Sequence, residues 1–170
     1  IHIDDPFAMA NLKADVHWSG FESLIGIIFI AIVIYSVFLI RNQRKKIIVF
    51  LSACILFLWF TIVIIVPKVE GYSQRSAIEF YKKLEDQDVY IATLGFKSYA
   101  HLFYSKVQPH ENIRATDTQW LLNGDIDKPA YFLFKINRKE RYLEEYSQLE
   151  YLYEKNGFVF TKRLQDDKEQ

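Results

Sequence analysis

The sequence predicts a membrane protein in two parts: an α-helical transmembrane hairpin, followed by a small α/β domain with a mainly parallel three-stranded sheet. Two apolar runs of 20 residues, Phe21–Ile40 and Ile47–Val66, carry a single charge, Glu22. A helix rises about 1.5 Å per residue, so each run can cross a hydrocarbon core about 30 Å thick. After the second run, helical and strand-like patterns alternate, which indicates strands joined by helical crossovers.

The turn between the two apolar runs is strongly basic and predicts the orientation of the hairpin. Its six residues read RNQRKK, and the four cations are Arg41, Arg44, Lys45 and Lys46. Short basic loops stay on the cytoplasmic side of a membrane. We therefore expect these cations to determine the topology, with residues 1–20 and 67–170 on the far side.

Charge and cysteine content limit what the protein can be. Residues 1–66 carry five basic and four acidic groups, and residues 67–170 carry 16 and 17, a net charge of −1. This balance argues against a nucleic-acid partner, which would need a basic stripe. The single cysteine, Cys54, cannot form an intrachain disulfide. The chain starts at Ile1 without a signal-peptide pattern, so we expect it to be a piece of a longer polypeptide.

The exported part is predicted to alternate helix and strand three times. Helices are expected over 72–84, 99–105, 118–122 and 138–156, and strands over 89–94, 130–136 and 158–164, with an irregular stretch over 107–115. Pro67 should end the second span, since proline cannot continue a helix without losing a hydrogen bond. Ser76 and Glu79 fit a capping box, although Ser73 could cap the helix one turn earlier. Gly157 fits the residue that follows a helix.

The residues of the central predicted strand, 130–136, should face both layers of the domain. Phe132 and Phe134 are expected on one side of the sheet and Leu133 on the other, because successive side chains of a strand point to opposite faces. This pattern predicts a sheet covered by helices on both faces.

The best local candidate for chemistry is Gly95-Phe96-Lys97-Ser98, a predicted strand-to-helix turn. Glycine permits a tight turn, and free N–H groups at a helix N-terminus beside a lysine can hold a phosphate. An ordinary turn with a solvated lysine and a capping serine explains the same residues. Lys97 and Ser98 are therefore the candidate anion contact.

Asp4 and Asp5 form a second candidate, an acidic pair in a loop. Adjacent carboxylates can hold a divalent cation or a substrate hydroxyl, but consecutive side chains point in different directions and two ligands do not complete a site. A solvated acidic pair is the competing interpretation. His101 is expected to be a surface or satisfied core residue on its short helix rather than a metal ligand. We assign no metal site and no catalytic residue.

Four stretches have a familiar pattern. They are IHIDDPFAMANLKADVHWSGFESLIG, EGYSQRSAIEFYKKL, DVYIATLGFKSYAHLFY and LLNGDIDKPAYFLFK. Together they resemble the C-terminal end of Bacteroidetes GT-C type membrane glycosyltransferases, which are relatives of the dolichyl-phosphate-mannose protein mannosyltransferases and of the lipid A aminoarabinose transferase. The resemblance covers essentially all 170 residues, and it lies in overall texture and layout rather than in a short diagnostic motif.

The resemblance implies a polytopic enzyme of the bacterial inner membrane with a periplasmic C-terminal domain. Such enzymes move a sugar from a polyprenyl-phosphate donor to an acceptor, and their catalytic acidic residues lie in the first periplasmic loop. No position here matches that loop, so the resemblance carries over no catalytic residue and assigns no enzyme activity to this segment alone. The implied partners are the lipid bilayer, upstream transmembrane helices of the same polypeptide and the donor lipid. No cofactor is expected in this segment, while a divalent metal stays open for the parent enzyme.

A membrane-anchored periplasmic binding or assembly module is the alternative to the transferase. In that case the two spans would anchor a domain that recognises a partner protein or cell-wall material. The upstream reading frame distinguishes the two, because only the transferase requires many additional apolar spans.

Overall fold

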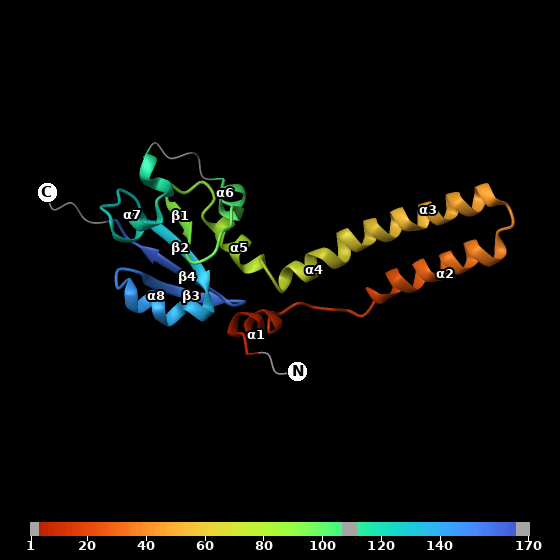
Figure 1. Cartoon of the computed structure of the whole chain (residues 1–170), viewed down its shortest axis with the longest axis horizontal. Helices are drawn as coiled ribbons and strands as arrows, with labels where there is room; N and C mark the ends of the chain where they lie inside the picture. Colours follow the sequence, from red (N-terminus) through yellow and green to blue (C-terminus); the bar gives the residue numbers. More distant parts are fainter. Residues whose placement is uncertain (1–3, 107–111, 166–170) are drawn as a thin grey trace. The chain divides into compact units, whose positions relative to one another are not determined.

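The computed structural model describes residues 4–106 and 112–165 and divides into two compact units. The α/β unit comprises the described parts of 1–14 and 73–170. The helical unit comprises Asp15–Tyr72. The chain thus leaves the α/β unit after Ala14 and returns to it at Ser73, with the helical unit inserted between. Figure 1 shows the elements of both units along the chain.

The α/β unit is built on a four-stranded mixed sheet with the strand order β1-β2-β4-β3 (Figure 1). Its strands are β1 (Tyr90–Thr93), β2 (Ala130–Lys135), β3 (Glu150–Lys155) and β4 (Phe158–Arg163). β1 and β2 are parallel, whereas β4 is antiparallel to both β2 and β3. The sequence correctly predicts a small α/β sheet, but the prediction of three mainly parallel strands is wrong.

Short helices precede β1 and connect β1 to β2 and β2 to β3. They are α1 (Pro6–Leu12), α5 (Arg75–Lys83), α6 (Ala100–Tyr104), α7 (Thr118–Asn123) and α8 (Lys139–Glu145), with the 3₁₀ segments η2 (Ile113–Thr116) and η3 (Ile136–Arg138). The predicted capping box is wrong: α5 starts after Gln74, and the hydroxyl of Ser76 is buried without a hydrogen-bond partner among the described residues. Most of the stretch predicted as irregular, 107–111, lies outside the described residues.

Apolar side chains cover both faces of the sheet, as the alternation predicts. Phe132 and Phe134 pack with Leu121 of α7 and Tyr142 of α8 in one buried cluster. Leu133, between them in sequence, packs in a second cluster on the opposite face. The residues from α5 and β4 in that second cluster are Ala77, Phe80, Tyr81, Phe158 and Phe160. Burial of both faces supplies the main stabilisation of a unit this small.

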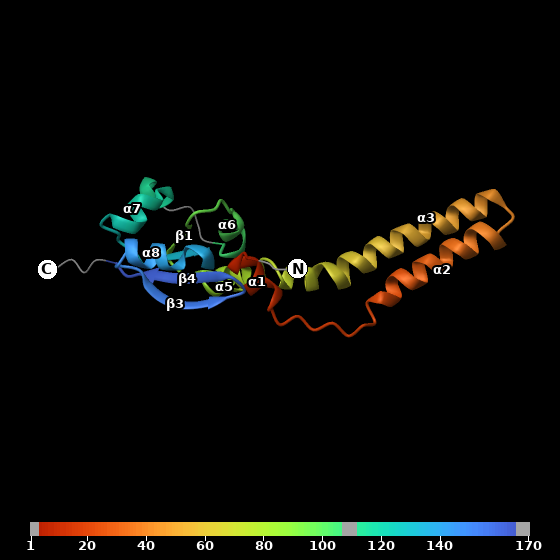
Figure 2. The same cartoon turned by 60° about the horizontal axis from the view of Figure 1, so that its bottom comes forward.

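The strand that the sequence missed lies in 138–156, the stretch predicted as a single helix. α8 ends at Glu145, and the chain continues as β3 and then as β4 (Figure 2). Asn156 and Gly157 form the turn between these two strands. Both turn residues have positive φ, 50° and 76°, which a two-residue type I′ hairpin turn requires. β3 runs in the same direction as β2, and the hairpin then reverses the chain. β4 is therefore antiparallel to β2 instead of parallel.

The N-terminal segment is not a separate element but part of the α/β unit. The ring of Phe7 on α1 packs edge-on against Phe158 of β4, with 5.1 Å between ring centroids. A Cβ atom added at Gly157 would lie 2.8 Å from the Phe7 ring. The sequence predicts residues 1–20 as a polar exported segment and gives no sign of this packing.

The helical unit contains two long helical stretches joined by a short turn. They are α2 (Ser23–Leu39) and a continuous stretch made of α3 (Gln43–Phe60), the π segment η1 (Thr61–Ile65) and α4 (Val66–Gly71). The Ser36 hydroxyl donates to the Lys46 carbonyl over 3.1 Å, and Phe29 stacks on Phe57 with 4.5 Å between centroids. α2 and α3 are therefore packed against each other.

Pro67 does not end the second helix, so that prediction is wrong. The proline lies near the start of α4, directly after η1. In η1 the Val66 N–H donates to the carbonyl of Thr61, five residues back. Such a π turn changes the hydrogen-bond register ahead of the proline and so relieves the clash that proline causes in a regular helix.

Among the described residues, one helix is long and apolar enough to cross a membrane. It is the stretch Gln43–Gly71, of 29 residues. α2 is apolar as well, but at 17 residues it is shorter. The transmembrane hairpin therefore stays a prediction.

Candidate functional site

The turn Gly95-Phe96-Lys97-Ser98 follows β1 and leads into α6, as the sequence predicts. Gly95 has φ +74° and lies so close to Tyr142 that a Cβ atom would be 2.6 Å from its hydroxyl oxygen. The Thr93 hydroxyl donates to the Phe96 carbonyl over 2.9 Å. Ser98 accepts a hydrogen bond from the Ala100 N–H, but the N-cap residue of α6 is Tyr99, so Ser98 lies one position before the expected cap.

Two cavities flank this turn within the α/β unit. The first has a volume of about 290 Å³ and lies among α1, α5, β2, β4 and the turn. The second, of about 380 Å³, lies beside β1, α6 and α7. Phe96, Lys97 and Ser98 line both cavities. The turn therefore places Lys97 between two cavities, which the sequence could not show.

The first cavity brings together residues that are far apart in the sequence. Lys97 from the turn lines it with Lys135 from the end of β2. Asn11 of α1 and Tyr81 of α5 line it too, and each has a buried polar atom, Oδ1 and the phenol OH, with no hydrogen-bond partner among the described residues. Three of these residues, Asn11, Tyr81 and Lys135, were missed, and no local motif signals them.

The second cavity contains His101, which is partly buried and whose ring lies 6.0 Å from that of Tyr81. Burial lowers the pKa of the imidazole, although a hydrogen bond with the Ser98 backbone opposes the shift. Its Nδ1 atom is buried without a hydrogen-bond partner among the described residues. The sequence predicts a surface residue or a satisfied core residue. His101 is neither, because it is partly buried and its Nδ1 atom has no partner among the described residues.

Asp4 and Asp5 precede α1. The Asp5 carboxylate accepts a hydrogen bond from the Phe7 N–H over 2.9 Å and so caps α1. In the described ranges, no three side chains of His, Cys, Asp or Glu are grouped so that they could hold a metal ion. The geometry gives Asp5 a helix-capping role, which sequence reasoning did not assign.

The basic residues between the apolar runs are partly helical. Arg41 lies in the turn, whereas Arg44, Lys45 and Lys46 form the first turn of α3. The Asn42 side chain caps this helix by accepting from the N–H groups of Arg44 and Lys45. Positive charges at a helix N-terminus oppose the helix dipole, so these three cations do not stabilise the helix that contains them.

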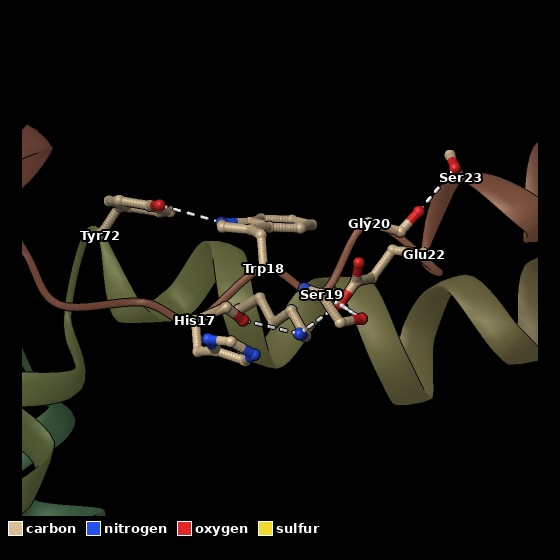
Figure 3. A network of polar contacts seen from close by, with 8 residues as sticks. His17, Trp18, Ser19, Gly20, Glu22, Ser23 and Tyr72 are labelled. Atoms are coloured by element: carbon tan, nitrogen blue, oxygen red, sulfur yellow. Dashed lines mark hydrogen bonds and ion pairs between the residues drawn. The ribbon is translucent and has the colours of Figure 1, made fainter.

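A polar network at the opposite end of the helical unit joins residues 17–22 to α4 (Figure 3). The Lys68 ammonium pairs with the buried Glu22 carboxylate and donates to the His17 carbonyl over 2.8 Å. Ser19 donates to the same Glu22 oxygen from its N–H and its hydroxyl. Glu22, the one charge in the apolar runs, is thus neutralised within its own unit.

Aromatic groups extend this network. The Trp18 indole donates to the Tyr72 hydroxyl over 2.9 Å (Figure 3), and the Lys68 ammonium lies 5.4 Å from the centre of the Trp18 ring. Tryptophan and tyrosine are enriched where a protein crosses from hydrocarbon to headgroups. Trp18 lies just before the apolar run Phe21–Ile40, where such a residue belongs, but no local pattern signals Lys68 and Tyr72 as its partners.

Comparison with known proteins does not add an assignment. No family model matches the chain, and no curated protein or solved structure matches it.

Proposed function

We propose that the chain is the C-terminal membrane hairpin and periplasmic accessory domain of an integral membrane glycosyltransferase. In this proposal the parent enzyme moves a sugar from a polyprenyl-phosphate donor to an acceptor, and the segment is non-catalytic in isolation. The proposal rests on the resemblance over the whole chain, together with a layout that suits it: an apolar helix pair inserted into a small α/β unit.

The single observation that best supports the membrane hairpin is this insertion. Residues on both sides of the helical unit belong to one α/β unit, so a helical unit that enters a bilayer must leave it on the side from which it entered. In this proposal, α2 and the stretch Gln43–Gly71 would be the two crossings of this path. At about 1.5 Å per residue, the 17 residues of α2 measure about 26 Å. Hydrogen-bonded turns from Gly20 and Phe21 lead into it.

The surface of the helical unit also supports placement in a bilayer. Large apolar side chains along both helices are exposed, including Phe38 at 80% and Ile55 at 67%. An apolar surface of this kind is unfavourable in water and is typical of a surface that contacts lipid or a protein partner. In the proposed enzyme, the bilayer and the upstream transmembrane helices cover it.

The accessory role of the α/β unit follows from where the resemblance places catalysis. The acidic catalytic loop of these transferases belongs to a part of the enzyme N-terminal to this segment. A polyprenyl-phosphate donor needs a groove that opens to the bilayer, and two helices do not enclose one. The α/β unit would therefore support or cap a transferase core, with Lys97 as the residue that contacts an anionic group.

The reading frame and the parent enzyme test this proposal. The native frame should extend hundreds of residues upstream with many apolar spans. Residues 1–170 in lipid nanodiscs should transfer no sugar from a polyprenyl-phosphate donor, whereas the parent should. In the parent, Lys97→Ala should lower activity modestly, as the loss of one electrostatic contact. Turnover by residues 1–170, or a frame that starts near Ile1, would contradict the transferase assignment.

A membrane-anchored binding module is the second candidate function. The cavity lined by Lys97 and Lys135 favours it, since a binding module needs a concave site with a few polar groups. A short native reading frame would select this alternative.

A further inference from the structure

We propose that the 290 Å³ cavity of the α/β unit binds an amphipathic anion, whose phosphate or carboxylate lies at Lys97 and Lys135 and whose short apolar chain lies against Phe7, Phe96 and Phe158. All lining residues belong to the α/β unit. The site is therefore independent of the membrane hairpin and of the transferase assignment.

The charge of the cavity wall selects an anion. Among the described residues that line it, two are lysines and none is acidic. In the same unit, Lys106, Lys128, Lys139 and Lys155 each pair with a carboxylate. Lys135 instead has its ammonium 4.6 Å from the centre of the Phe7 ring. Two lysines at one hollow, in a chain without net charge, form a local positive site suited to a phosphate or carboxylate.

The rest of the wall selects an apolar chain. Ala77, Leu133 and Phe158 belong to the second core cluster, and Ile78 is buried as well. All four line the cavity beside Phe7 and Phe96. Apolar walls with a few convergent polar groups are typical of sites for small molecules. The cavity volume of about 290 Å³ is at the small end for such sites. The apolar chain of the ligand should therefore be short or only partly enclosed.

A buried donor without a partner is the second, independent sign of a ligand. Tyr81 lines the cavity and is 1% exposed, yet its hydroxyl has no hydrogen-bond partner among the described residues. Burial raises the pKa of this phenol, so it remains a donor at neutral pH. Leaving such a group unpaired costs free energy. The hydroxyl is fully buried in this structure, so a small shift of the phenol on binding would let an anionic oxygen accept its hydrogen bond.

Binding can be measured on the full chain in nanodiscs of zwitterionic lipid, with the isoleucine methyl groups labelled with ¹³C. Hexyl phosphate is the probe, and the Ile78 resonance reports occupation of the cavity. We expect a saturable shift with hexyl phosphate and much weaker effects from inorganic phosphate, which lacks the chain, and from hexyl glucoside, which lacks the charge. Equal affinity for hexyl glucoside would overturn the anion site, and equal affinity for inorganic phosphate would overturn the apolar part.

Three variants locate the site. Tyr81→Phe removes only the hydroxyl and should weaken hexyl phosphate binding about tenfold, since hydrogen bonds to charged groups are the strong ones, while the unfolding midpoint stays the same or rises. Lys97→Gln with Lys135→Gln should abolish the shift, and Lys162→Gln, outside the cavity, should leave it unchanged. Unaltered affinity in the lysine variant refutes the proposal. If that variant unfolds, unaltered affinity in Tyr81→Phe refutes it instead.

A last arm identifies the source of the anion. Nanodiscs that contain phosphatidate present the same headgroup chemistry from the bilayer. A shift of the Ile78 resonance without added probe would assign the site to a membrane lipid. A shift with hexyl phosphate alone would assign it to a soluble anion.

Discussion

At His101, burial determines which protonation state the folded protein tolerates. The imidazole is partly buried beside Tyr81, and desolvation lowers its pKa below the ordinary value of 6.5. In the unfolded chain the same side chain titrates at about 6.5. As the pH falls, the unfolded state therefore takes up a proton more readily than the folded state. The stability associated with this group is present above pH of about 6.5 and is lost as the pH falls below it.

We therefore expect acidification from pH 8 to pH 5 to destabilise the α/β unit, and His101→Phe to reduce this dependence. Urea unfolding of the full chain can be followed through Trp120, with Trp18 and Trp59 replaced by Phe. His17→Phe is the control, because His17 is exposed and lies in the other unit. An unchanged pH dependence in His101→Phe would show that other groups cause it.

At the scale of elements, residues 138–156 show why one predicted helix is in fact the helix α8 followed by the strand β3. Tyr142, Tyr146, Leu149 and Tyr153 have helical spacing, and the first three do pack in one cluster. Tyr153 instead packs in the cluster on the other face, because the chain has already become β3. Asn156-Gly157 between two short runs is a strong hairpin signal. A helix that ends at Gly157 needs the same positive φ, so local conformation alone did not distinguish the two.

Gly157 is required by both its φ and its neighbour, so its replacement should be costly. In Gly157→Ala, a Cβ atom at φ +76° would also meet the Phe7 ring at 2.8 Å and its carbonyl oxygen at 3.0 Å. We expect a loss of about 1–3 kcal/mol in unfolding free energy, typical of backbone strain at such positions.

Asn156→Gly is the matched control for this turn, because glycine adopts the φ of 50° found there without strain. It should change the unfolding free energy far less than Gly157→Ala. Similar values for the two variants, measured by urea unfolding, would contradict the assigned turn.

At the scale of the whole molecule, the sequence predicted the separation into an apolar helical part and an α/β part. The division is visible because it depends on composition, which is a local property. The packing of α1 on the α/β unit was not predictable, since it depends on a contact between Phe7 and Phe158 that are 151 positions apart. The candidate site behaved likewise: Lys97 and Ser98 were identified from a local turn, while Tyr81 and Lys135 reach the same cavity only through the fold.

The basic residues at the start of α3 give the last prediction, the orientation of the chain in a membrane. Arg44, Lys45 and Lys46 oppose the dipole of the helix they begin, so helix stability does not explain their position, and we propose that they serve to orient the chain in the membrane. With Arg41, they should hold the turn in the cytoplasm. Because both flanking segments belong to one unit, both ends of the chain should then be periplasmic.

A reporter that is active only in the cytoplasm, fused after Gln170, should be silent, and one active only in the periplasm should give signal. Replacing the four cations by Gln should weaken this preference, since the positive charges oppose transfer of the turn across the membrane. Replacing Lys82, Lys83, Lys128 and Lys162 of the α/β unit by Gln removes the same charge elsewhere and should leave the preference intact. A strong cytoplasmic signal from the unaltered chain would reverse the assigned topology.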